Sequence, residues 1–185
     1  MGQGALVLVV GPSGAGKDTL IAAARDALAD DERFVFVRRV VTRDAVAELE
    51  DHETIDREGF EAARGRGEFA LDWEAHGFSY ALPGSVEEAL ADGRIVVANV
   101  SRRVVPEALG KYARARIVLV TADAAVRARR LAGRGRESAE EVVARLSREG
   151  APVRADVAPA VIDNSGTLEA GIGAFVKAMK AIASE

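Results

Sequence analysis

The chain has 185 residues, and its 25 Lys plus Arg against 29 Asp plus Glu give a formal net charge of −4. Hydrophobic residues make up 49% and charged residues 29%, a balance that excludes intrinsic disorder and supports one packed core. The absence of cysteine excludes disulfides and thiolate metal sites and favours a reducing compartment. No apolar run reaches the roughly 18–20 residues of a membrane span, and an acidic chain is not typical of nucleic-acid binders. We therefore expect a single cytoplasmic domain, residues 1–185, that binds neither membrane nor nucleic acid.

Strands and helices alternate along most of the chain. In chain order, the hydrophobic pattern predicts a buried strand at Ala5–Val10, a helix from Lys17 to about Ala29, and a strand at Phe34–Val41. After residue 83 it predicts helix Ser85–Gly93, strand Ile95–Val100, strand Arg116–Thr121, helix Asp123–Ala132, helix 138–149, strand Ala160–Ile162 and helix Thr167–Ala183. Ser85 and Ser138 each precede a glutamate by three residues, which is the spacing of a capping box. Such alternation predicts an α/β fold whose parallel sheet is covered by helices on both faces.

Residues 42–83 differ from the segments on either side. They are polar, with short aromatic pieces and only one clear helical stretch at about 57–65. We interpret them as a lobe inserted between core segments of about 1–41 and 84–185. Within this lobe, Trp73 and Tyr80 are expected to form a small core rather than a stacking platform for a ligand.

The segment Gly11-Pro12-Ser13-Gly14-Ala15-Gly16-Lys17 fits the pattern G-x-x-x-x-G-K between a buried strand and a helix. The glycines let successive backbone N–H groups point into one concavity, and the start of the helix adds its positive dipole end. Lys17 supplies a charge for β- and γ-phosphates. An ordinary glycine-rich turn would need neither this lysine nor this spacing, so the segment predicts a phosphate-binding loop.

The position after the lysine departs from this pattern. Where Ser or Thr normally ligates Mg²⁺, the chain has Asp18, with Thr19 one residue later. Strand 95–100 also lacks the usual supporting carboxylate, since its end reads Asn99-Val100-Ser101. One hypothesis is that Asp18 brings to Mg²⁺ the negative charge that this strand lacks. The alternative is that Asp18 is an acid in the first helical turn, favoured by the helix dipole.

Arginines cluster after the predicted strand at 116–121. Arg134 and Arg136 are flanked by glycines, which is typical of a lid that closes over a transferring phosphoryl group, and we place this lid at about 133–138. For Arg127 and Arg129 we favour a solvated helix face paired with neighbouring glutamates.

Together these segments resemble the guanylate kinase family over nearly the whole chain. The resemblance is carried by the phosphate loop at 11–19, Thr42-Arg43, the acceptor lobe at 73–83, and the lid with its following helix at 131–146. It implies a P-loop kinase fold with an inserted acceptor-binding lobe and an arginine-rich lid.

The acceptor site departs from the guanylate pattern. Three residues after Arg43, where that family has a second arginine, this chain has Val46. The two carboxylates that follow the equivalent of strand 95–100 are replaced by Asn99 and Ser101, and Arg102 comes next. Replacing acids by neutral groups and adding an arginine favours a second phosphate over the donor edge of guanine.

With these departures the chain is similar to the ribose 1,5-bisphosphate phosphokinase family of phosphonate breakdown. The shared segments are Lys17-Asp18, Thr42-Arg43-Asp44, Glu50-Asp51-His52, Leu71-x-Trp73 with His76-Gly77 and Tyr80, Asn99-x-Ser101-Arg102, and Gly133-Arg134-Gly135-Arg136-Glu137. The similarity implies ATP- and Mg²⁺-dependent conversion of ribose 1,5-bisphosphate, a phosphorylated sugar, to 5-phospho-α-D-ribose 1-diphosphate.

This resemblance also implies a role for each site residue. The reacting phosphates would be handled by Lys17, Arg43, Arg134, Arg136 and Arg145. ATP would be bound by Gly11, Pro12, Ser13, Gly14, Ala15, Gly16, Lys17, Asp18 and Thr19, with Arg130 and Asn164 at the adenine. The acceptor would be bound by Arg43, Glu50, His52, His76, Tyr80, Asn99, Ser101 and Arg102, the last being the candidate for its 5-phosphate.

Two rival interpretations stay open. The first is a kinase of the same fold that phosphorylates GMP, in which Asp72 or Glu74 would read the guanine. The second is a non-catalytic module that binds protein partners, although the intact Lys17 and lid arginines weigh against it. The oligomeric state does not follow from the sequence.

Overall fold

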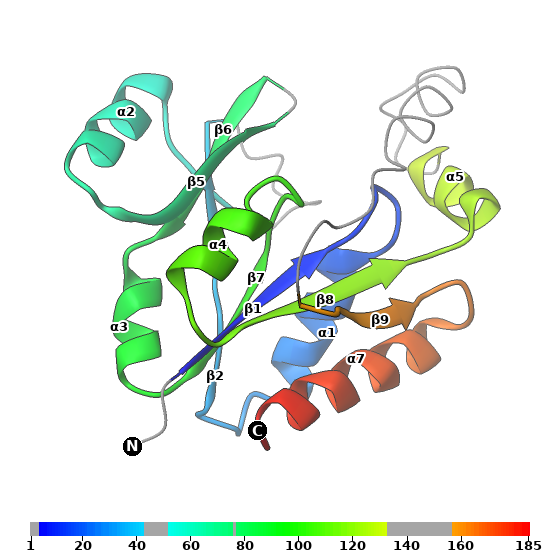
Figure 1. The fold of residues 1–185 in the computed structure, drawn as a ribbon. Coiled ribbons are helices and arrows are strands. Elements are labelled where there is room, and N and C mark those ends of the chain that lie inside the picture. Colours follow the sequence, from blue (N-terminus) through cyan, green and yellow to red (C-terminus); the bar gives the residue numbers. More distant parts are fainter. Residues whose placement is uncertain (1–3, 43–51, 76, 133–156) are drawn as a thin grey trace.

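The computed structural model describes residues 4–42, 52–75, 77–132 and 157–185, which form two sheets (Figure 1). The larger sheet is parallel throughout, with strand order β2-β7-β1-β8-β9. Its strands are β1 (Ala5–Val10), β2 (Phe34–Phe36), β7 (Ile95–Asn99), β8 (Ala115–Thr121) and β9 (Ala160–Asp163). The central strand β1 is buried along its whole length, as its unbroken apolar sequence predicts.

Helices cover both faces of this sheet (Figure 1). Alternate side chains of β1 point to opposite faces, as the pleat requires. Val7 and Val9 pack against α1 (Lys17–Ala27) and α7 (Leu168–Ile182), while Leu6 and Leu8 pack on the face that α3 (Ser85–Ala91) and α4 (Val105–Lys111) cover. The remaining described helices are α2 (Arg57–Gly65) and α5 (Ala124–Ala132). The predicted α/β fold is confirmed. None of the helices in the described ranges is long and apolar enough to cross a membrane.

The second sheet has the order β4-β3-β6-β5; β4, β5 and β6 come from the inserted segment 42–83, and β3 lies directly before it. Its strands are β3 (Arg39–Val41), β4 (His52–Thr54), β5 (Phe69–Ala75) and β6 (Phe78–Pro83), with β5 and β6 paired antiparallel. One face packs on α2 through Val40, Phe60 and Ala81. The other face, including Val41 and Leu82, belongs to the same hydrophobic cluster as β1. The two sheets therefore share a core.

The predicted strand at Phe34–Val41 is wrong, because the structure divides it between the two sheets. The first part, β2, pairs with β7. The second part, β3, pairs with β4 and β6. The division comes at Val37 and Arg38, and the reason is physical: charged Arg38 and Arg39 do not fit a strand buried on both faces of a parallel sheet. The chain leaves the large sheet where the arginines begin.

Two smaller differences concern helix starts. Ser85 does not cap α3, because the helix begins at Ser85 itself and the cap residue is Gly84. Thr167 does cap α7, where its hydroxyl accepts a hydrogen bond from Ala170 N at 3.2 Å. Helix α4 was not predicted, since seven residues give too little hydrophobic periodicity. The helix predicted at 138–149 lies outside the described residues.

Candidate functional site

The loop between β1 and α1 lies at the carboxyl end of the central strand, where parallel sheets usually bind ligands. Its three glycines have positive φ: +153° at Gly11, +77° at Gly14 and +90° at Gly16. A Cβ on Gly11 would lie 2.1 Å from the carbonyl oxygen of Val120 on β8. The glycine-rich pattern is therefore required both by backbone conformation and by the close approach of the neighbouring strand.

The loop curls around the ammonium group of Lys17. Its Nζ donates to the carbonyl oxygen of Gly11 at 2.9 Å and to that of Pro12 at 3.2 Å. Helix α1 starts at Lys17 with Gly16 as its cap residue, so no cap side chain occupies its first N–H groups. A concave backbone, a lysine and a helix start at one point form a cradle suited to phosphate groups.

Two side chains distant in sequence brace this loop from behind. Asn164, after β9, donates from Nδ2 to the carbonyl oxygen of Ala15 at 2.8 Å. Arg130, on α5, donates from Nη2 to the backbone oxygen of Asn164 at 3.0 Å and from Nη1 to that of Gly14 at 3.4 Å. Asn164 is 1% exposed. The family resemblance implies that these two residues contact the adenine of ATP. In this structure both donate hydrogen bonds to carbonyl oxygens of the loop.

Asp18 and Asn99, the two departures noted in the sequence, contact each other. Asn99, at the end of β7, donates from Nδ2 to Asp18 Oδ1 at 2.6 Å. Arg39 Nη2 lies 3.9 Å from the same oxygen, and the Asp18 side chain is 40% exposed. One carboxylate beside a phosphate cradle fits Mg²⁺, which prefers few protein ligands together with phosphates and water. Within the described ranges, no group of three or more His, Asp or Glu side chains could hold a metal.

The smaller sheet presents one row of side chains on the face that joins the large sheet. Tyr80 stacks on Trp73 with 5.7 Å between ring centroids, and both are 7% exposed. They are core residues, as expected, but they belong to the large hydrophobic cluster shared with β1 and not to a small core of the lobe's own. The Arg39 guanidinium lies 5.7 Å from the Tyr80 centroid. His52 is the register partner of Arg39 on β4, is 3% exposed, and has no hydrogen-bond partner for either ring nitrogen among the described residues.

Asp72 and Glu74 alternate with Trp73 along β5 and therefore lie on the opposite face. Asp72 accepts a hydrogen bond from Arg64 of α2 at 2.6 Å, and this pairing contributes to raising the pKa of Arg64 against the opposing effect of burial. Neither carboxylate shares the face of Tyr80, so neither is placed to read a base there.

The turn after β7 carries Ser101 and Arg102, both partly exposed. Ser101 Oγ accepts a hydrogen bond from Arg103 N at 3.3 Å, which is a local turn contact. In the first residues after β3, Thr42 Oγ1 accepts from Ser79 N at 2.9 Å and fixes this strand against β6. Thr19 is exposed on α1. The other predicted site residues, Arg43, Glu50, His76, Arg134, Arg136 and Arg145, lie outside the described residues.

Sequence reasoning missed Arg39. The hydrophobic pattern placed Arg38 and Arg39 within a single strand at Phe34–Val41, whereas a charged pair inside an apolar run is itself a signal. In the structure both line a small cavity of about 50 Å³ beside the phosphate loop, together with Asp18, Arg25 and Asn99. The cavity adjoins the residues that the sequence singled out for the metal.

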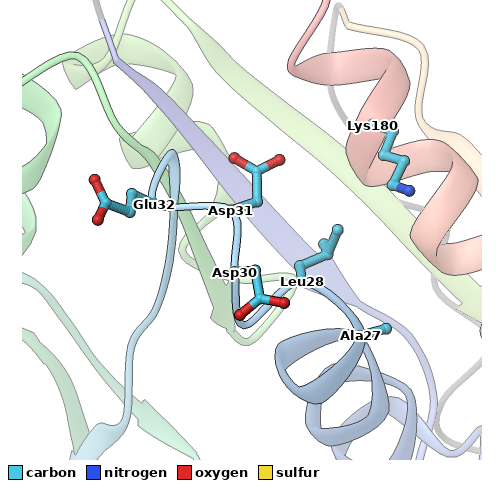
Figure 2. A pocket seen from close by; sticks show the side chains of 6 residues that line it. All are labelled: Ala27, Leu28, Asp30, Asp31, Glu32 and Lys180. Carbon is cyan, nitrogen blue, oxygen red and sulfur yellow. The ribbon is translucent and has the colours of Figure 1, made fainter.

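A larger surface depression of about 550 Å³ lies at the other end of α1, away from the loop (Figure 2). It is lined by Ala27, Leu28, Asp30, Asp31, Glu32 and Lys180. The Arg33 side chain donates to both oxygens of the Asp31 carboxylate, at 2.7 and 2.9 Å, and this pairing lowers the pKa of Asp31. Its acidic lining is unsuited to phosphates, so we place the functional site at the loop.

Comparisons with known proteins identify close relatives. No family profile matches the chain. Ribose 1,5-bisphosphate phosphokinase PhnN from Brucella melitensis biotype 2 is 47% identical over 181 residues, which cover 98% of this chain and 94% of that protein. The protein of the same name from Methylobacterium radiotolerans is 48% identical over 178 residues, covering 96% and 98%. Among solved structures, guanylate kinase from Anaplasma phagocytophilum matches with a TM-score of 0.66 at 16% identity, over 100% of this chain and 86% of that one. That likeness confirms the fold.

Proposed function

The chain belongs to the ribose 1,5-bisphosphate phosphokinase family, and on this basis we propose that it transfers a phosphoryl group from ATP to ribose 1,5-bisphosphate. The products would be 5-phospho-α-D-ribose 1-diphosphate and ADP. The observation that carries the proposal is the identity of 47–48% over nearly the whole length of both proteins. The glycine-lined loop, with Lys17 bonded to its carbonyl oxygens, supports the proposal, because such a reaction needs a site for phosphates.

The reaction joins two phosphates. An oxygen of the sugar's 1-phosphate attacks the γ-phosphorus of ATP, the bond from that phosphorus to the β–γ bridging oxygen breaks, and ADP leaves with its electron pair. The attacking oxygen is already anionic, so little general-base catalysis is needed. Positioning the two phosphates and neutralising their charge would supply most of the rate.

On the ATP side, residues 11–19 would cradle the phosphates, and Lys17 would contact the β- and γ-phosphates. Arg130 and Asn164 would keep the cradle in shape through the loop carbonyls that they bond, next to the adenine position expected for them. Mg²⁺ held by Asp18 and the nucleotide phosphates would supply positive charge to the transferred group. The Asn99 amide would orient the Asp18 carboxylate.

On the acceptor side, Arg43 would position the reacting 1-phosphate, and Arg102, in the turn after β7, would contact the 5-phosphate. His52 and Tyr80 would line the acceptor site from the smaller sheet, where both lie on the face that joins the core. Glu50, His76, Asn99 and Ser101 complete the proposed acceptor set. Arg134, Arg136 and Arg145 would close over the γ-phosphate, in line with their expected place in the lid.

The test is an ADP-release assay with ATP and Mg²⁺ that compares ribose 1,5-bisphosphate and GMP at equal concentration, with the product identified by phosphorus NMR. We expect turnover with the sugar bisphosphate and at most trace turnover with GMP. Lys17→Ala should lower the rate about 100-fold or more, because the positive charge that stabilises the transferring phosphoryl group is removed. Lys177→Ala, on the exposed side of α7, is the matched control and should keep full activity. Turnover with GMP alone would refute the proposal.

A further inference from the structure

We propose that Arg39 binds the phosphate of the acceptor that does not react, and so makes the site selective for a sugar with two phosphates. The inference rests on the proposed function, in which Arg102 contacts this phosphate, and adds Arg39 as a second binding residue that the sequence did not identify. Arg39 lies on β3 of the smaller sheet, and its side chain approaches Asp18, the residue directly after the lysine of the phosphate loop.

Within the described part of the chain, neighbouring side chains hold the Arg39 guanidinium in position but leave its N–H donors available to a ligand. On one side its Nη2 is 3.9 Å from Asp18 Oδ1, which is longer than a hydrogen bond, and on the other its carbon lies 5.7 Å from the Tyr80 ring centroid. Its side chain is only 14% exposed. Among the described residues no hydrogen bond is found to this guanidinium. A planar group with five donors, held in place by a ring and a carboxylate, is prepared to bind a phosphate.

The cavity beside Arg39 has the size and charge for one phosphate. Its volume of about 50 Å³ is far below the several hundred Å³ of a pocket for a whole nucleoside or drug-sized ligand. Among the described residues, Arg25, Arg38 and Arg39 line it together with one carboxylate, Asp18, so positive charge prevails in this part of the lining. Apolar residues of α1 and β2, including Phe36, complete the wall.

The position of the cavity relates it to the reaction. Asp18 belongs both to the cavity lining and to the first turn of α1, directly after the lysine of the phosphate loop. An acceptor whose reacting phosphate lies at the loop can therefore extend its other end toward Arg39. A pentose with phosphates at its two ends has this form, whereas GMP would direct a neutral base toward the arginines and leave them unpaired.

Asp18 also holds the Arg39 side chain in position before the acceptor binds. In the described structure the carboxylate is shared between the Asn99 amide and the Arg39 guanidinium. The shared contact keeps the arginine near the cavity at little cost, because the 3.9 Å ion pair is weaker than the bidentate contacts that a phosphate would make. Arg39 thus needs little rearrangement to bind the acceptor.

The experiment measures binding by calorimetry for two half-acceptors, ribose 5-phosphate and ribose 1-phosphate, and for ATP. Arg39→Met should weaken ribose 5-phosphate binding about 30-fold while leaving ribose 1-phosphate and ATP within about threefold. Arg39→Lys keeps the charge without the planar fork and should fall between wild type and Arg39→Met. Arg33→Met, an exposed arginine paired with Asp31, is the control and should change none of the three affinities.

The outcomes separate this proposal from the one on which it rests. Equal weakening for both half-acceptors, no weakening for ribose 5-phosphate, or no binding of ribose 5-phosphate by wild type would each overturn the role of Arg39. A lowered unfolding midpoint together with loss of all three ligands would assign Arg39 a merely structural role and also overturn it. Failure of wild type to phosphorylate ribose 1,5-bisphosphate would refute the proposed function. Selective loss of ribose 5-phosphate binding in Arg39→Met would still support the phosphate site.

Discussion

The phosphate loop and the acceptor face of the smaller sheet are held in shape by different means. The loop depends on its backbone. Its glycines have positive φ, Lys17 donates to carbonyl oxygens of the loop, and β8 lies so close to Gly11 that a Cβ there would not fit. The acceptor face depends on side chains brought together by strand register, with His52 beside Arg39 and Tyr80 beside Trp73. A site built from the backbone is expected to lose all ligand binding when a substitution prevents the required backbone conformation. A site built from side chains is expected to lose only the contact of the side chain that is replaced. The predictions for Gly11, Asp18 and His52 test this contrast.

The largest effect is expected for Gly11→Ala. The added methyl would lie 2.1 Å from a β8 carbonyl at a φ of +153°, so the loop or the strand must move. We expect the free energy of unfolding to fall by about 3 kcal/mol or more, and ATP binding to be lost. Urea denaturation and calorimetry measure the two effects. Gly173→Ala, in a helix position with open space, is the matched control and should stabilise by about 0.5–1 kcal/mol. A stable, ATP-binding Gly11→Ala protein would contradict the backbone account.

Asp18→Asn removes the charge at the point where the two regions meet and keeps an oxygen that can still accept from Asn99. The fold should therefore be unchanged, while the Mg²⁺ concentration for half-maximal activity rises at least about 10-fold. A Mg²⁺ titration of initial rates, alongside urea denaturation, checks both statements. Asp26→Asn on the exposed part of the same helix serves as control. An unchanged Mg²⁺ midpoint would leave Asp18 as an acid that merely favours the start of α1.

His52→Phe tests whether a buried, unpaired side chain on the acceptor face acts on substrate. Because neither ring nitrogen has a partner among the described residues, replacing the ring by an apolar one should cost little stability. We expect KM for ribose 1,5-bisphosphate to rise about 10-fold, with KM for ATP unchanged. Steady-state kinetics with each substrate varied in turn gives the answer. If both KM values stay at the wild-type level, His52 only fills space in the smaller sheet.

The smallest effect concerns a contact outside the site, between the helices that cover the large sheet and strand β5 of the smaller sheet. The hydroxyl of Tyr112, the residue directly after α4, lies 2.7 Å from the Glu87 carboxylate and 3.2 Å from the Ala70 carbonyl of β5. Burial first, and then the Glu87 hydrogen bond, raises the pKa of Tyr112 above its ordinary value near 10. The unfolded tyrosine then ionises first, so this stabilisation is complete below about pH 10 and is lost as the pH rises toward the folded pKa.

Tyr112→Phe should consequently flatten the fall in stability above about pH 10, by about 1 kcal/mol or less. Urea denaturation at a series of pH values measures it. Activity near neutral pH should not change, because Tyr112 contacts Glu87 and Ala70, which are not part of the proposed site. An identical pH profile in wild type and Tyr112→Phe would show that this hydroxyl does not govern alkaline stability.

The sequence determined the parts of this protein that are local. The apolar run of β1, the glycine spacing after it and the lysine at the start of α1 are consecutive residues, so their geometry follows from backbone conformation alone. The departures at Asp18 and Asn99 were also visible, and the structure joins the two side chains by a hydrogen bond, while the Mg²⁺ role of Asp18 stays a prediction.

The tertiary structure decided what depends on contacts between distant segments. It split the run at 34–41 between two sheets, because only packing shows which half of an apolar run is covered on both faces. It placed Arg130 and Asn164, which are separated from the loop by more than a hundred residues, on the loop carbonyls. It also set Arg39 between Asp18 and Tyr80. Strand register and crossover fix these positions, and neither is encoded in the spacing of neighbouring residues.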